Sequence, residues 1–186
     1  MARTFLEARY INKPINYDGS QLSPNWIYQS FGIMGDAAVA FIGACDITES
    51  MVDVEDVIAG SEIRADKMLH FIIELFGRDC VFSAAIQSVL VGEIQSELLR
   101  HGAKVVKAGD DLFVGKGKLS ISIATASAVS GLIHIGLNIT NSGTPVKTSA
   151  LKDLGINQKK FAVSILRRFN KEYSRIILAA AKVRPR

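Results

Sequence analysis

Cysteine is scarce in this chain of 186 residues, which contains only Cys45 and Cys80. Two cysteines so far apart are too few for a disulfide scaffold or a thiolate metal site, so we expect both thiols to be reduced. No apolar run reaches the roughly 18 residues that a membrane span needs. The opening MARTFLEARY also lacks the apolar stretch of a secretory signal. The sequence therefore predicts a cytoplasmic protein without a membrane partner.

Motifs of several common enzyme classes are missing as well. The chain has no GxGxxG after a strand-like run, no GxxxxGKS or GxxxxGKT, no HExxH and no GxSxG. These absences argue against the two common nucleotide-binding loops, a zinc site and a serine nucleophile. No Gly/Ser/Pro-rich linker and no internal repeat divides the chain, and 48% of its residues are hydrophobic. Residues 1–186 are therefore expected to form a single domain around one core.

Acidic residues are nearly absent from the C-terminal segment. Residues 159–186 contain nine of the 22 Lys/Arg but only one of the 18 Asp/Glu, so this segment carries +8 although the whole chain carries +4. The segment falls on a basic amphipathic helix predicted over residues 158–181. Such a patch attracts nucleic acid or an acidic carrier protein. A solvated helix face is the alternative, and both interpretations stay open.

Hydrophobic periodicity predicts an α+β fold, in which a mixed or antiparallel sheet is sandwiched with helices. Asp66 is a suitable N-cap for a helix over residues 67–76, where apolar side chains recur at helical spacing. The acidic segment 49–63 is predicted to be a loop or a single turn. The other predicted helices cover residues 24–31, 82–101 and 158–181, and the predicted strands cover residues 3–10, 37–43, 103–109, 111–114, 118–125 and 132–139.

Aspartates and histidines are the first candidates for chemistry. Aspartates occur mostly in turn-like segments, where the side chain commonly bonds nearby backbone N–H groups. Asp36 and Asp46 flank one predicted strand, so they could meet at one sheet edge and hold a divalent cation. His70 is expected on the surface of the helix predicted over residues 67–76. His134 interrupts an apolar strand, which indicates either a hydrogen-bonded core histidine or one that faces a pocket.

The segments GDDLFVGKGKLSISIATAS, LIHIGLNI and GTPVKTSALKDLGI resemble the core of the biotin/lipoate protein ligase and octanoyltransferase superfamily, whose fold is similar to the class II synthetase catalytic domain. The resemblance implies that Lys118, at the start of a strand, stabilises negative charge on a carbonyl or phosphate oxygen. It also implies that His134 and Asn138 line the pocket. The chain departs from the superfamily because it lacks an arginine- and glycine-rich loop and has no cysteine after Cys80. Thioester chemistry of the octanoyltransferase kind is therefore not expected.

Motifs along nearly the full length are also similar to a prokaryotic family of unknown function with this ligase-like fold. They are YDGSQLSPNW, GDAAVAFIGACD, MVDVEDV, MLHFIIELF, GDDL, KLSISIATAS and GTPVKT. The two resemblances imply a site in which Lys118 and His134 are catalytic. The candidate ligand-binding residues are Asp18, Gly19, Asp36, Asp110, Asp111, Asn138 and Thr144, with Asp18 on a covering loop.

Three functions remain open at this point. The first is a ligase- or acyltransferase-like enzyme that activates or transfers a small carboxylate ligand without a cysteine nucleophile, with the use of ATP and Mg²⁺ undecided. The second is a non-catalytic ligand-binding or regulatory domain on the same fold. The third is binding of nucleic acid or an acidic carrier protein through the basic C-terminal helix. A homodimer is a reasonable default for a chain of this size.

Overall fold

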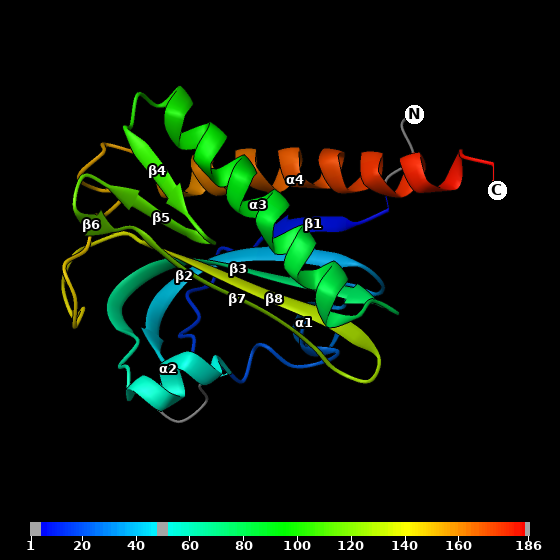
Figure 1. Ribbon diagram of the computed structural model, residues 1–186, viewed down its shortest axis with the longest axis horizontal. Coiled ribbons are helices and arrows are strands. Elements are labelled where there is room, and N and C mark those ends of the chain that lie inside the picture. Colours follow the sequence, from blue (N-terminus) through cyan, green and yellow to red (C-terminus); the bar gives the residue numbers. More distant parts are fainter. Residues whose placement is uncertain (1–4, 48–51, 185–186) are drawn as a thin grey trace.

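A mixed five-stranded sheet lies at the centre of the structure, a computed structural model that describes residues 5–47 and 52–184 (Figure 1). Its strands follow the order β1-β2-β3-β8-β7, with β1 parallel to β2 and the other neighbours antiparallel. A smaller antiparallel sheet has the order β4-β5-β6. The strands are β1 Glu7–Tyr10, β2 Ala37–Asp46, β3 Arg64–Phe76, β4 Val105–Ala108, β5 Asp111–Val114, β6 Gly117–Lys118, β7 Ser120–Ala126 and β8 Ser130–Asn138.

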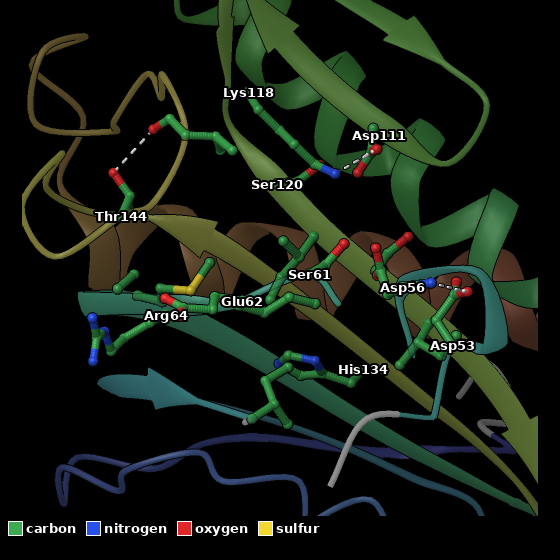
Figure 2. A pocket seen from close by; sticks show the side chains of 18 of the residues that line it. Asp53, Asp56, Ser61, Glu62, Arg64, Asp111, Lys118, Ser120, His134 and Thr144 are labelled. Carbon is green, nitrogen blue, oxygen red and sulfur yellow. Dashed lines mark hydrogen bonds and ion pairs between the residues drawn. The ribbon is translucent and has the colours of Figure 1, made fainter. Parts of the chain in front are cut away.

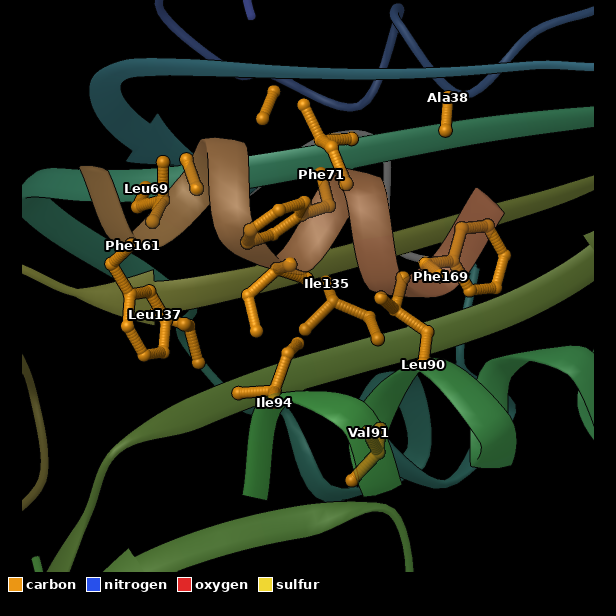
Figure 3. Close-up of a cluster of buried hydrophobic side chains, with 14 of the residues drawn as sticks. Ala38, Leu69, Phe71, Leu90, Val91, Ile94, Ile135, Leu137, Phe161 and Phe169 are labelled. Carbon is orange, nitrogen blue, oxygen red and sulfur yellow. The ribbon is translucent and has the colours of Figure 1, made fainter. Parts of the chain in front are cut away.

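The two long helices, α3 (Cys80–Arg100) and α4 (Gln158–Ala181), cover one face of the five-stranded sheet (Figure 1). The larger apolar cluster lies between these helices and the sheet (Figure 3). Full burial of one such side chain contributes about 1.5–3 kcal/mol, so this layer dominates the stability of the fold. Side chains from both layers meet there, among them Leu69, Phe71 and Ile135 of the sheet and Leu90, Ile94, Phe161 and Phe169 of the helices. The predicted α+β class is confirmed.

The opposite face of the sheet is covered by the N-terminal segment and α1 (Trp26–Phe31). A second apolar cluster forms there, which includes Tyr17, Ile27 and Phe41. The short helix α2 (Val54–Ala59) has no buried residue and stands off the sheet on this side (Figure 1). The part of this face that lies beside α2 is where the cleft described below opens.

The helix predicted over residues 67–76 is wrong, because this segment belongs to β3. Alternate side chains of β3 enter the two apolar clusters, with Leu69 and Phe71 on the helix side and Met68 and Ile72 on the other. A strand buried on both faces reads as a continuous apolar run rather than an alternation. Such a run also satisfies helical spacing, so periodicity alone could not separate the two structures.

The other predicted elements lie close to their ranges, but the segment 49–63, predicted as a loop or a single turn, contains the six-residue helix α2. Helix α4 has the predicted bounds, and α3 and the strands between the two long helices differ from prediction by a few residues. Helix α1 begins at Trp26 because Asn25 has a left-handed φ of 64°. The strand predicted from residue 3 begins at Glu7, and residues 3 and 4 lie outside the described part of the chain. The single-domain organisation stays a prediction.

The basic surface of α4 is partly neutralised by the protein itself. The Arg168 guanidinium lies 2.5 Å from a carboxylate oxygen of Glu93, and Arg175 lies 2.5 Å from Glu172. These pairs involve two of the nine cationic side chains of residues 159–186, so both interpretations of this surface stay open. Within the described residues, no helix combines the length and the apolar character needed to cross a membrane.

Candidate functional site

A cleft of about 400 Å³ opens on the sheet face opposite α3 and α4 (Figure 2). Strands β3, β7 and β8 supply side chains to its floor, while the α2 segment, β5, β6 and residues 144–148 supply its walls. Segments far apart in the sequence therefore meet in one place. Six of the residues proposed from the sequence line the cleft: Asp110, Asp111, Lys118, His134, Asn138 and Thr144.

Lys118 is fixed at the cleft by its backbone. Its N–H donates to the Lys147 carbonyl (3.1 Å), while its carbonyl accepts from the Ser149 N–H (3.0 Å) and from the Asn138 side-chain amide (3.1 Å). The Lys118 ammonium lies 2.7 Å from Oδ2 of Asp111 (Figure 2). The cleft thus holds a lysine whose position is set by three backbone contacts and whose charge is met by one carboxylate.

The neighbouring carboxylates Asp110 and Asp111 have different surroundings. Asp110 Oδ2 accepts a hydrogen bond from the Ser122 hydroxyl (2.8 Å). Partial burial raises the pKa of Asp111 above its usual value, and the charges of Asp110 and Asp56 act in the same direction, whereas Lys118 lowers it. Asp111 therefore takes up a proton more readily than an ordinary aspartate.

His134 belongs to the cleft floor although it is only 1% exposed. Its Nε2 lies 3.0 Å from Nδ1 of His70, and Nε2 of His70 lies 3.3 Å from the Gly43 carbonyl oxygen. The Tyr17 ring stacks on His134 with a centroid distance of 3.7 Å and an interplanar angle of 17°. Burial lowers the pKa of both histidines, and for His134 the neighbouring His70 adds to the effect. Both rings are therefore neutral near pH 7.

Three other proposed residues do not line the cleft. Asp18 accepts hydrogen bonds within its own turn, in which Gly19 has a φ of 92°. The Asp36 carboxylate accepts from the Phe76 N–H (2.8 Å) and the Tyr173 hydroxyl (2.5 Å), so it fastens α4 to the sheet. Both aspartates use their oxygens on the protein itself, as turn aspartates commonly do. We therefore leave all three out of the proposed site.

The expectation that Asp36 and Asp46 meet at one sheet edge is wrong. They lie at opposite ends of β2, which spans ten residues. A strand rises about 3.3 Å per residue, so the two carboxylates are separated by roughly 30 Å. Among the residues that the structure describes, no group of three or more His, Cys, Asp or Glu side chains is arranged to hold a metal ion.

Several cleft residues were missed or misplaced by the sequence reasoning. Tyr17 adjoins the turn that drew attention to Asp18, yet it is Tyr17 that reaches the cleft. Met68 and His70 were assigned to a helix, and the surface position expected for His70 is wrong because that side chain is fully buried on β3. Arg64, at the start of β3, carried no motif. The register between paired strands would have placed these residues correctly, but it cannot be read from one segment of the sequence.

The lining of the cleft is predominantly acidic. It contains six carboxylates but only two cationic side chains. Carboxylates that share a cleft attract cations and repel highly charged anions. The carboxylates are Asp53, Glu55, Asp56, Glu62, Asp110 and Asp111, and the cations are Arg64 and Lys118.

Comparison with known proteins gives a family match and relatives of unknown function. A family model described as a domain of unknown function, DUF366, matches residues 6–184. An uncharacterised protein of Methanocaldococcus jannaschii is 29% identical over 159 residues, which cover 82% of this chain and 72% of that protein. The solved structure of a protein of unknown function from Pyrococcus horikoshi is 38% identical, has a TM-score of 0.94 and covers 97% of this chain and 99% of its own.

More distant structures share the fold at low identity. A biotin protein ligase mutant from Aquifex aeolicus in complex with biotin superposes with a TM-score of 0.57 at 13% identity, over 89% of this chain and 69% of its own. A putative lipoate protein ligase from T. acidophilum with bound lipoic acid superposes with a TM-score of 0.58 at 14% identity, over 89% of this chain and 85% of its own. The predicted likeness to biotin/lipoate protein ligase catalytic domains is confirmed for the fold.

Proposed function

The chain belongs to the DUF366 family, and we propose that its cleft binds a small carboxylic acid whose carboxylate is held by Lys118. The observation that carries this proposal is the fixed lysine, with its ammonium at the cleft wall 2.7 Å from Asp111. A lysine in a partly enclosed site attracts a carboxylate more strongly than one in bulk water, because the local dielectric constant is lower. The proteins of similar fold named above hold biotin and lipoic acid, which are both small carboxylic acids, and this likeness supports the same ligand class.

The size of the ligand charge decides which anion the acidic cleft accepts. A monocarboxylate brings one negative charge, which Lys118 meets directly, and Asp111 can offset it further by taking up a proton. ATP carries several negative charges on adjacent phosphates and would face six carboxylates with two cations. The residues present therefore do not fit a triphosphate, and we derive no adenylation step. The sequence left the use of ATP and Mg²⁺ undecided, and a homodimer stays a prediction from the sequence.

Between the two small-ligand functions, the charges of the cleft favour binding without activation. The described residues of the cleft include no cysteine, so no thioester step is available within them. Lys118, Asn138 and Asp111 form a connected set that can recognise a carboxylate without any further chemistry. We therefore propose a ligand-binding module on a ligase-like fold.

Lys118→Ala tests the proposal directly. We expect octanoic, lipoic or biotin carboxylates to bind the wild-type chain and to lose at least about tenfold in affinity in the variant, because a charge-assisted contact contributes on the order of 1.5–3 kcal/mol. Isothermal titration calorimetry measures the loss. The fold should be nearly unaffected, because the Lys118–Asp111 pair is partly exposed and such pairs contribute about 1 kcal/mol or less.

Lys116→Ala is the matched control, because Lys116 lies two residues away and is exposed outside the cleft lining. It should bind the acids as the wild type does. Equal affinity in Lys118→Ala and in the wild type would refute the role of Lys118. No binding of any of the three acids to the wild type would refute the ligand class.

Acid binding should also become tighter as the pH falls towards the raised pKa of Asp111. The pKa of Asp111 is already raised, and a ligand carboxylate beside it raises it further, so binding takes up a proton and is favoured by low pH. The gain ends where the ligand itself is protonated, at about pH 4–5 for an ordinary carboxylic acid. Calorimetry in buffers of different ionisation enthalpy measures the proton uptake. Asp111→Asn should remove both the uptake and the slope, and a slope that persists in this variant would assign it to another group.

A further inference from the structure

We propose that Nδ1 of His134 accepts a hydrogen bond from an N–H or O–H group of the ligand, so that the cleft selects acids that carry such a donor over plain hydrocarbon acids. This inference rests on the proposed function for the carboxylate end of the ligand. It concerns the opposite end, which lies on the cleft floor. His134 thereby becomes a specificity-determining residue.

The tautomer of His134 follows from its neighbours. The Gly43 carbonyl can only accept, so Nε2 of His70 carries the hydrogen in that 3.3 Å contact. A neutral His70 then has a bare Nδ1, which accepts from Nε2–H of His134 across 3.0 Å. A neutral His134 that donates from Nε2 has no hydrogen on Nδ1. The chain of contacts from Gly43 therefore ends in an acceptor on His134.

That acceptor is left without a donor by the protein. Among the residues that the structure describes, none donates a hydrogen bond to Nδ1 of His134. Tyr17 covers one face of the ring, and the side chain as a whole is 99% buried yet forms part of the cleft floor. Nδ1 is not among the fully buried atoms that lack a partner, so it is open to the cleft, where a ligand can supply the donor. The lone pair of Nδ1 is the polar feature that His134 offers to the cleft.

Strand β8 runs along the cleft floor from the backbone of Lys118 to His134. Asn138, whose amide contacts the Lys118 carbonyl, lies four residues from His134 on the same face of the strand. Four residues of strand span about 13 Å. Gly136, between them, is covered by two apolar side chains, because a Cβ there would lie 2.9 Å from Cε of Met68 and 3.1 Å from Cγ1 of Ile121. Both side chains line the cleft, so an acid with a chain of several carbons between its carboxylate and its donor would place that chain on an apolar surface.

Octanoic acid and 8-hydroxyoctanoic acid form a matched pair for the test, since they differ only in the terminal hydroxyl. We expect the hydroxy acid to bind the wild-type chain about 3- to 10-fold more tightly, the range that one added neutral hydrogen bond supports. His134→Leu should abolish the preference. His134→Gln, which retains an acceptor oxygen, should keep part of it. Titration calorimetry gives each ratio, and a ratio of one or less in the wild type would overturn the inference.

A second measurement uses a neutral fragment without a carboxylate, so it does not depend on the binding of acids by the wild-type chain or by any variant. The chain has only three histidines, so the ¹⁵N signals of the rings can be resolved by NMR and His134 assigned by their change in His134→Gln. We expect a bare Nδ1 and a protonated Nε2 for His134. The neutral fragment 2-imidazolidinone, which carries two N–H groups, should shift the Nδ1 signal, and its N,N′-dimethyl analogue should not.

These two experiments separate the inference from the proposed function. Suppose that octanoic acid and 8-hydroxyoctanoic acid bind equally and that Lys118→Ala abolishes the binding of both. The carboxylate site is then supported and the role of His134 is refuted. If neither acid binds but 2-imidazolidinone shifts the ¹⁵N signal of Nδ1, the carboxylate site is refuted and the acceptor role of His134 is supported. A protonated Nδ1 in the free protein would overturn the inference whatever the acids do.

Discussion

Gly43→Ala should destabilise the protein by more than about 3 kcal/mol, at or above the upper end of the usual cost of overpacking. A Cβ at residue 43 would lie 1.7 Å from the carbonyl oxygen of Ile15 and 2.4 Å from its carbonyl carbon. Both atoms belong to backbone, and that backbone is held to β2 on either side. The Ile15 N–H donates to Ile42 (3.0 Å), and the Tyr17 N–H donates to Ala44 (2.8 Å). Neither segment can move away without breaking these contacts.

Gly92→Ala provides the matched control with the opposite sign. Gly92 lies inside α3, and nothing stands within 4 Å of the position its Cβ would take. Alanine is favoured over glycine in a helix by about 1 kcal/mol, so this variant should be stabilised. Urea denaturation of the two variants and the wild type measures both changes. If Gly43→Ala unfolds at the wild-type midpoint, the segment around Ile15 does not pack on β2 as described.

The sequence predicted α4 at its observed bounds, and this helix buries one face. Helix α4 presents a single apolar stripe to the sheet, and its N-cap Asn157 accepts a hydrogen bond from the Lys160 N–H (3.0 Å). Both features are visible in the letters of the sequence. Strand β3 carries neither, because apolar residues fill both of its faces and Asp66 does not begin a helix. Its assignment needs the partner strands β2 and β8, which only the fold supplies.

The candidate site was predicted in part. Lys118 on β6 and Asn138 on β8 were found through the resemblance to the ligase superfamily, and His134 on β8 also because it interrupts an apolar strand. Asp36 was placed with them because a turn aspartate that fastens α4 has the same sequence context as one that binds a ligand. Tyr17 was missed because its position depends on the pairing of distant backbone with β2.

Glu74→Leu should cost about 2–4 kcal/mol of stability, although the new side chain is apolar and the site is in the core. Glu74 is 1% exposed, and its Oε1 accepts from the Asn25 N–H (2.7 Å) and from the Ser130 hydroxyl (2.8 Å). Leucine would leave the Asn25 N–H without this acceptor and the Ser130 hydroxyl with only its 3.3 Å contact to the Ser127 hydroxyl, and a buried donor that loses its partner costs about 1–3 kcal/mol. Asn25 also has a φ of 64°, so the contact that holds it in this unfavoured conformation would be lost.

Ser130→Ala, alone and combined with Glu74→Leu, shows whether the lost hydrogen bonds cause this destabilisation. In the wild-type background the serine variant removes a hydroxyl bonded to Glu74, but in the Glu74→Leu background that bond is already lost and only the contact to Ser127 remains. The serine substitution should therefore cost less in the second background, with a coupling of about 0.5–3 kcal/mol in a double-mutant cycle. Glu74→Gln, which retains an acceptor oxygen, should lose less than half as much as Glu74→Leu. Additive costs in the cycle would mean that Glu74 stabilises the core through packing alone.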